Sequence, residues 1–227
     1  MSILIFNSPL THTLKPYCKL FLSVSLFLPI ALCAQQDWQL AKSKNGINVY
    51  TKYYKSHGLK QLRVESTFTG VNLHTMFAIF KDLDSTHIWT AKLNHAKSLK
   101  EYSQTDYINY FLINIPWPLR NRDAIFKVHA SFNKQDHSLQ IESKAFPEFA
   151  AENDTCVRVR EAHAVWRFTQ IDSGIKVQSS LYADPRGFPG WLVNLFVTDA
   201  PYETMYRLRQ FSKKNKYKNA KFDFISD

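Results

Sequence analysis

Glycine and cysteine are scarce in this sequence of 227 residues, which contains 6 Gly and 3 Cys. No glycine-rich phosphate loop of the type GxxxxGK or GxGxxG occurs. Neither an HExxH zinc motif nor a GxSxG serine elbow is present, and the eight His residues lack zinc-ligand spacing. Because these motifs of enzymatic chemistry are missing, we expect no catalytic residue, no bound metal and no cofactor.

The N-terminus carries the pattern of a secretion signal. Lys15 and Lys19 precede an apolar run over residues 20–32, and small residues follow it. This order is typical of a signal peptide cleaved before Gln35, and the run is shorter than the roughly 20 residues that a membrane-spanning helix needs. We expect export, into the periplasm if the organism is a diderm bacterium. An uncleaved membrane anchor is the alternative. Only Cys156 would remain after cleavage, which excludes an internal disulfide.

The chain is basic and rich in aromatic residues. Its 29 Lys and Arg against 19 Asp and Glu give a net charge of +10, and 15% of the residues are aromatic. A basic surface attracts anionic partners such as nucleic acids or lipid headgroups. Because the basic residues are scattered and no RNP-like or zinc-finger signature accompanies them, we expect no nucleic-acid partner. Transient contact with an anionic membrane surface is the interpretation that remains.

Alternating apolar runs predict strands over most of the chain. The runs at 47–53 and 59–69 flank Ser56-His57-Gly58, which predicts a hairpin. Further strands are predicted at 95–103, 105–114, 123–132, 138–145, 157–170 and 174–183. Short turns between consecutive strands favour an antiparallel sheet.

Helices are predicted in the middle and at the end of the chain. Apolar residues at i, i+3, i+4 and i+7 predict a helix over 72–83 capped by Asn72, and a second short helix begins at Asp84. A two-part C-terminal helix is predicted by two apolar stripes, the first at Trp191, Leu192, Leu195 and Phe196, and the second at Tyr202, Met205, Leu208 and Phe211. Pro201 would lie in the first turn of its second part. A solvated basic tail is expected at 215–227.

Two motifs carry a family resemblance. The segment 116–123 (PWPLRNRD) joins two predicted strands, and the segment 182–194 (YADPRGFPGWLVN) leads into the C-terminal helix. Together with Trp89 and the order of the elements over 38–214, they resemble the steroidogenic-acute-regulatory-related lipid transfer (START) domain. The resemblance implies an α+β helix-grip fold, in which a curved antiparallel β-sheet wraps around a long C-terminal α-helix and encloses a tunnel for one lipid. The START-type domain would span 35–214, after a signal peptide over 1–34.

The resemblance implies a lipid-binding protein without covalent catalysis, which sequesters a sterol-like or acyl lipid or transfers it between membranes. We expect a monomer. The alternative is an enzyme resembling the polyketide cyclase/aromatase branch of the same fold, with Arg158, Arg160 or Tyr107 as inward polar residues. A third interpretation is a membrane-surface protein that uses its lysine-rich tail.

Strand alternation and the resemblance together predict which side chains line the tunnel. These lipid-binding residues are Trp89, Phe111, Ile113, Arg122, Ala124, Phe126, Val128, Ala162, Ala164, Trp166, Trp191, Leu192, Leu195 and Phe196. Two alternatives stay open: the stripe of the C-terminal helix is ordinary core, and Arg122 with Asp123 braces the preceding loop rather than holding a headgroup.

Two positions differ from those of family members that carry phosphatidylcholine, and two exposed aromatic residues are predicted to form a gate to the tunnel. Members that carry phosphatidylcholine resemble one another in having aromatic residues where Ala124 and Ala162 stand, so choline specificity is not expected. Trp117 and Phe188 are predicted to form a gate that dips into lipid headgroups, with the lysines of 213–218 adding attraction to anionic lipid. The alternative is a Trp117 buried beneath its own loop.

Overall fold

The computed structural model describes residues 38–54, 59–184, 187 and 197–226. They belong to one structural unit, 36–227. The predicted signal peptide, Phe188 and the first stripe of the C-terminal helix (Trp191, Leu192, Leu195 and Phe196) lie outside the described residues. No helix within the described ranges is both long enough and apolar enough to cross a membrane.

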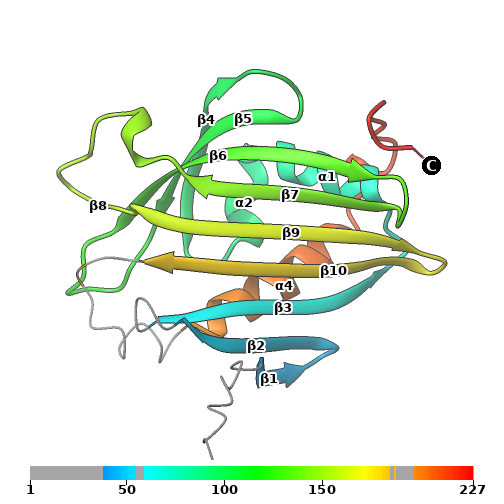
Figure 1. The fold of residues 1–227 in the computed structure, drawn as a ribbon, viewed down its shortest axis with the longest axis horizontal. Coiled ribbons are helices and arrows are strands. Elements are labelled where there is room, and N and C mark those ends of the chain that lie inside the picture. The colour runs from blue at the N-terminus through cyan, green and yellow to red at the C-terminus, as the bar shows by residue number, and fades with distance from the viewer. Residues whose placement is uncertain (1–37, 55–58, 185–186, 188–196, 227) are drawn as a thin grey trace, which may run out of the picture. The chain divides into compact units, whose positions relative to one another are not determined.

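The described strands form a single ten-stranded sheet. They are β1 (Gln39–Lys44), β2 (Ile47–Tyr54), β3 (Leu59–Thr69), β4 (Leu93–Glu101), β5 (Asp106–Ile113), β6 (Arg122–Asn133), β7 (Ser138–Ala145), β8 (Val157–Arg158), β9 (Glu161–Ile171) and β10 (Gly174–Asp184). Their order in the sheet is β1-β2-β3-β10-β9-β7-β6-β5-β4. The sheet curves, and the helices lie on one of its faces (Figure 1). The predicted helix-grip fold is confirmed.

Two details of the sheet differ from the sequence prediction. The strand β1 was not predicted, because its residues are mostly exposed and show no apolar alternation. The predicted strand 157–170 is two strands. The short β8 pairs in parallel with the start of β6, while β9 runs antiparallel between β7 and β10. All other strand pairs are antiparallel, as predicted.

Two short helices form where the apolar spacing changes. Helix α1 spans Leu73–Lys81, and its N-cap Asn72 accepts a hydrogen bond from the Thr75 amide at 2.8 Å, as predicted. Helix α2 spans Leu83–Trp89 and is capped by Asp82. A buried Trp89 ends it.

Helix α4 spans Asp199–Phe211, with Pro201 in its first turn as predicted. Its buried residues are Met205, Leu208 and Phe211. They pack into a core at the end of the sheet where β9 turns into β10, with the fully buried Phe68, Phe77, Phe168 and Ile175. This half of the sheet therefore encloses ordinary close-packed core.

The expectation of a solvated tail at 215–227 is wrong for the residues described. The segment contains a 3-10 turn, η2 (Asn215–Tyr217), and its apolar side chains pack against the core: Tyr217, Phe222, Phe224 and Ile225. The Phe77 ring of α1 meets Phe222 at 4.6 Å and Phe224 at 4.9 Å. The physical reason is burial of three aromatic rings and an isoleucine, which outweighs the solvation of the lysines between them.

Asp82 ties this C-terminal segment to the junction of α1 and α2. Its carboxylate accepts hydrogen bonds from the Ser85 amide at 3.2 Å and the Tyr217 hydroxyl at 2.6 Å, and it pairs with Lys216. Burial alone would raise the pKa of Asp82, but the hydrogen bonds from Lys216, Tyr217 and Ser85 outweigh it and lower this pKa from 3.8 to about 2.

This geometry predicts a specific acid sensitivity. Because the pKa of Asp82 is lower in the folded chain than in the unfolded chain, its stabilisation is complete above pH 3.8 and is lost as the pH falls toward 2. Unfolding followed by circular dichroism between pH 6 and pH 2 should show a smaller acid-induced loss of stability in Asp82→Asn than in the wild type. Equal losses in the two proteins would contradict the prediction. Glu203→Gln, which removes an exposed ion pair with Arg207, is the control.

Candidate ligand cavity

A cavity of about 320 Å³ lies between the inner face of the sheet, α2 and the first turns of α4. It adjoins the packed core, since Val64, Trp89, Tyr107, Val128 and Ile141 belong to both. Its described wall comprises Leu62, Val64, Phe80, Leu83, Thr86, Trp89, Thr90, Ala91, Leu93, Tyr107, Asn109, Phe111, Ile113, Phe126, Val128, Ile141, Ser143, Ala164, Trp166, Ser179, Leu181, Ala200, Pro201 and Thr204. This wall is largely apolar and has no charged side chain. The volume of the cavity lies at the small end of the range for ligand pockets.

Seven of the predicted lipid-binding residues lie on this wall: Trp89, Phe111, Ile113, Phe126, Val128, Ala164 and Trp166. Sequence reasoning missed the contributions of β3 and β10, such as Leu62 and Leu181, which face each other in the register of the two strands. The alternation of apolar residues along both strands was the available signal.

Aromatic contacts fix one side of the cavity. The Phe80 ring lies 5.0 Å from the ring of Trp89 and 5.3 Å from that of Trp166. The two indoles stand edge to face, with centroids 6.4 Å apart. These tilted and edge-to-face arrangements are the favourable ones for aromatic pairs, so the wall is held in shape by its own packing.

The placement of Ala124 and Ala162 on the cavity wall is wrong. Both alanines are buried in a separate small cluster with Val159, beyond the end of the cavity. Their side chains point to the predicted face of the sheet. At that end of β6 and β9, Phe126, Ala145 and Ala183 pack against the two alanines and Val159.

Arg122 is likewise not on the described wall of the cavity. It is buried at the start of β6, and its guanidinium donates a hydrogen bond to the carbonyl of Arg120. The contacts thus favour the alternative in which this residue braces the loop before β6.

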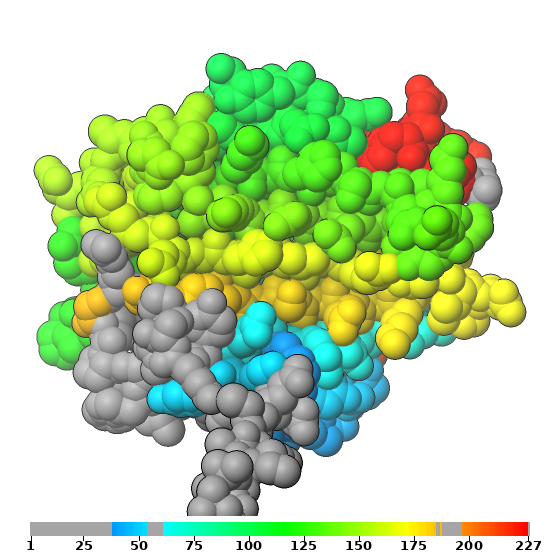
Figure 2. All heavy atoms as spheres, in the orientation of Figure 1, coloured from blue at the N-terminus to red at the C-terminus, as the bar shows by residue number. Residues whose placement is uncertain are grey.

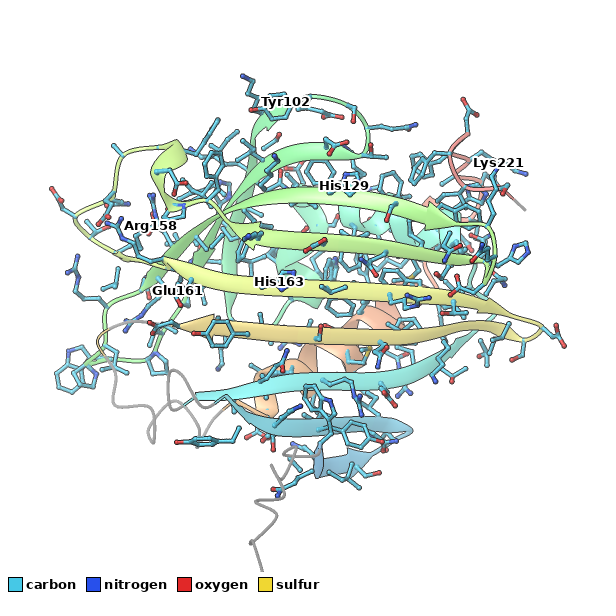
Figure 3. The ribbon with its side chains drawn as sticks, viewed as in Figure 1. Tyr102, His129, Arg158, Glu161, His163 and Lys221 are labelled. Atoms are coloured by element: carbon cyan, nitrogen blue, oxygen red, sulfur yellow. The ribbon has the colours of Figure 1, made fainter. Side chains whose placement is uncertain are left out.

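The adjacent Asp123 forms a fully buried ion pair with Arg158. Nε and Nη2 of Arg158 donate to the two carboxylate oxygens at 3.1 and 2.8 Å. The same guanidinium donates to the carbonyls of Pro147, Ala150 and Ala151 at 2.7–3.0 Å. Figure 3 shows Arg158 beside the loop that joins β7 to β8. This bidentate pair therefore closes a loop over the sheet and does not face the cavity.

Comparisons with known proteins agree with this architecture. No family model matches the chain. A STAR-related lipid transfer protein of Xanthomonas axonopodis superposes with a TM-score of 0.73 at 25% identity, covering 78% of this chain and 99% of that one. Human STARD10 superposes with a TM-score of 0.66 at 17% identity, over 77% of this chain and 72% of its own. The predicted resemblance to the START family is confirmed.

Two curated sequences are also similar to this chain. An uncharacterised protein of Pseudomonas aeruginosa is 28% identical over 188 residues, which is 79% of this chain and 88% of its own. The mouse phosphatidylcholine transfer protein is 24% identical over 170 residues, or 70% and 75% of the two chains.

The polar residues proposed for a cyclase on the START fold are only partly inside the cavity. Arg158 is engaged with Asp123, and Arg160 forms an exposed ion pair with Glu152. Tyr107 does line the cavity. Burial, with smaller contributions from Glu101 and Asp106, raises the pKa of Tyr107 far above its ordinary value. Its phenol therefore stays protonated and neutral at physiological pH. Within the described residues, no three His, Cys, Asp or Glu side chains come together as a metal site.

The proposed gate residue Trp117 is 91% exposed, which excludes the alternative that it is buried beneath its loop. It lies in the connection between β5 and β6, at the left end of Figure 1. The C-terminus lies at the right end. The segment 213–218 follows α4 on the way to this C-terminus. The attraction of its lysines to anionic lipid stays a prediction.

Proposed function

We propose that this START-type protein is an exported, monomeric carrier that binds one hydrophobic lipid in its cavity, without covalent catalysis. The observation that carries the proposal is the apolar cavity of about 320 Å³, which occupies a place where side chains would otherwise pack. Each ligand CH₂ moved from water into such a space contributes about 0.8 kcal/mol. An acyl chain or a compact ring system therefore supplies enough free energy for useful binding.

Support for lipid as the ligand class comes from the relatives. Two of them are described as lipid transfer or phosphatidylcholine transfer proteins. The match with the Xanthomonas axonopodis protein extends over 99% of that chain. Support for export comes from the basic and apolar pattern of 15–34.

Extraction of the protein purified from its native host tests carriage directly. We expect denaturing extraction and mass spectrometry to yield one hydrophobic lipid per chain. An empty cavity, together with turnover of a poly-β-ketone mimic, would favour the cyclase alternative. The same sample gives the mass of the mature N-terminus, which we expect near Gln35.

Transfer between membranes requires the protein to touch a bilayer, and we propose that Trp117 makes this contact. An exposed indole on a loop fits the membrane interface, where one edge meets lipid and the other meets water. Figure 2 shows the opposite, outer face of the sheet, where polar contacts such as that of His163 with Glu142 at 2.7 Å join neighbouring strands.

Trp117→Ala should slow lipid exchange between vesicles several-fold while leaving equilibrium lipid binding nearly unchanged. The indole is far more exposed than buried, so its removal weakens membrane contact without altering the cavity. Fluorescent-lipid transfer between vesicles measures the rate. Tyr102→Ala, which removes an exposed aromatic from the end of β4, is the control and should transfer at the wild-type rate. A Trp117→Ala protein that transfers at the wild-type rate would exclude the proposed contact.

A further inference from the structure

A second cavity, of about 310 Å³, lies between the loop that joins β7 to β8 and the end of the connection between β5 and β6. We call it the outer pocket. None of its described wall residues lines the apolar cavity. Because Ala124 points to the inner face of the sheet, the adjacent Asp123 and its partner Arg158 lie on the outer face. The outer pocket is therefore separate from the site that we assign to the carried lipid.

Backbone contacts of Arg120 hold the outer pocket in shape. Nη2 of Arg120 donates to the Cys156 carbonyl at 2.8 Å and also to the Asp154 carbonyl. The Val157 amide donates to the Asn121 carbonyl at 2.9 Å, which joins the loop before β8 to the loop before β6. A wall that is fixed before a ligand arrives loses little conformational entropy on binding.

The charges on the wall of the outer pocket are balanced. The charge of Arg158 is neutralised by its buried ion pair with Asp123. The exposed charges on the described wall are two guanidinium groups and two carboxylates, those of Arg120, Arg160, Glu152 and Asp154. A simple anion would meet two carboxylates here, and a simple cation would meet two guanidinium groups. A ligand that carries both charges has a partner for each of them.

The wall also restricts the chemistry of the two charged ends. It has no aromatic residue among those described, because its other members are an asparagine, a cysteine and a valine. A quaternary ammonium is recognised by aromatic faces, whereas a primary ammonium donates three hydrogen bonds that carboxylates accept. A planar guanidinium binds phosphate through two parallel hydrogen bonds. The outer pocket therefore fits a phosphate joined to a primary ammonium.

The outer pocket lies at the same end of the sheet as Trp117. The loop that joins β7 to β8 and the connection between β5 and β6 both lie at the left end of Figure 1. Arg158 lies at that end in Figure 3. Arg120 belongs to the same connection as Trp117, and it also lines the outer pocket. A bilayer that receives the indole of Trp117 therefore brings its headgroups to this end of the protein.

We propose that the outer pocket binds the headgroup of a membrane phospholipid that carries a phosphate and a primary ammonium, as phosphoethanolamine does. Arg120 and Arg160 bind the phosphate, and Glu152 and Asp154 bind the ammonium. The exposed pair of Arg160 with Glu152 is weak, so both side chains can exchange partners with the headgroup. This inference rests on the proposed function, because it names the headgroup at the membrane contact of Trp117.

Vesicle sedimentation with the purified protein tests the proposal. Vesicles of phosphatidylcholine alone are compared with vesicles of equal parts phosphatidylcholine and phosphatidylethanolamine. Both lipids are neutral overall, so the basic charge of the protein favours neither. We expect the wild type to bind the ethanolamine vesicles several-fold more tightly, and Arg160→Gln to lose most of this preference. Arg207→Gln is the matched control, since Arg207 forms an ion pair of almost the same exposure on α4, and it should keep the preference.

Asp154→Asn gives a readout that a merely structural role would not move. This change removes a partner of the ammonium and leaves both guanidinium groups in place. Binding to vesicles with phosphatidylglycerol, relative to those with phosphatidylethanolamine, should therefore rise several-fold over the wild-type ratio. Because Asp154 and Arg160 are exposed, the Tm of both variants should stay close to that of the wild type.

Soluble glycerophosphoethanolamine separates this proposal from the membrane contact itself. We expect it to shift the NMR signals of the Arg160 side chain without any membrane. If it shifts them but the wild type binds ethanolamine and choline vesicles equally, the ligand is a free zwitterion and the docking proposal is overturned. If it does not, or if Arg160→Gln keeps the wild-type preference, the outer pocket is no headgroup site, while slower transfer by Trp117→Ala still supports the membrane contact. If the wild type binds no vesicle, both proposals fail.

Discussion

Asp123→Asn should destabilise the protein by about 3–5 kcal/mol, the cost of leaving one partner of a buried ion pair uncompensated. The side chains of Asp123 and Arg158 are 0% and 1% exposed, so water does not replace the lost charge. Because Arg158 also holds three carbonyls of the loop before β8, the replacement should loosen that loop as well. Urea denaturation followed by circular dichroism measures the change.

Arg160→Gln is the matched control. Arg160 lies two residues after Arg158 and pairs with Glu152. Both of these side chains are more than two-fifths exposed. Such a pair contributes at most about 1 kcal/mol. If Asp123→Asn and Arg160→Gln lowered the free energy of unfolding by similar amounts, burial would not be what makes the Asp123–Arg158 pair stabilising. The double variant Asp123→Leu/Arg158→Met should recover only part of the loss, since the loop carbonyls would still lack their donor.

Ala164→Phe should strongly reduce the lipid bound by the protein while leaving it folded. Ala164 lies on the cavity wall and faces Leu181 and Ser143 on the neighbouring strands, both of which also line the cavity. An added ring would occupy space that we assign to the ligand. Lipid content after extraction gives the first measurement, and Tm gives the second.

Ala162→Phe provides the contrast from the same strand and the same face. Its side chain touches the cluster of Ala124 and Val159, where there is no room for a ring. Overpacking there should cost about 1–3 kcal/mol. If Ala164→Phe destabilised the chain as much as Ala162→Phe and kept its lipid, the cavity would not be the lipid site.

Ala162 and Ala164 show which part of the cavity could be predicted from the sequence and which could not. The period of two along β9 correctly places both residues on the inner face, because strand geometry alone decides it. Whether the space in front of an alanine is empty depends on which distant side chains reach it, and no local pattern records that. The cavity was therefore predictable as a face of the sheet, but not in its extent.

The helices were the more predictable elements. Asn72 caps α1, and its apolar spacing fixes the buried face, because both signals are local. The prediction for the C-terminal segment 215–227 was wrong because its signals are not local. Its lysines suggest a solvated tail, while Phe222 and Phe224 become informative only once Phe77 is known to lie opposite them. The pairing of Arg158 with Asp123 also joins residues far apart in sequence.

The pairing of β3 with β10 has a consequence for how the chain is made. Leu62 pairs with Leu181, so one edge of β3 stays unpaired until more than a hundred further residues have emerged from the ribosome. A sheet that closes through such distant contacts folds slowly, and the last aromatic residues then seal the core. During synthesis the sheet accordingly stays open until β10 is made, and its unpaired strand edge is a site at which nascent chains can aggregate.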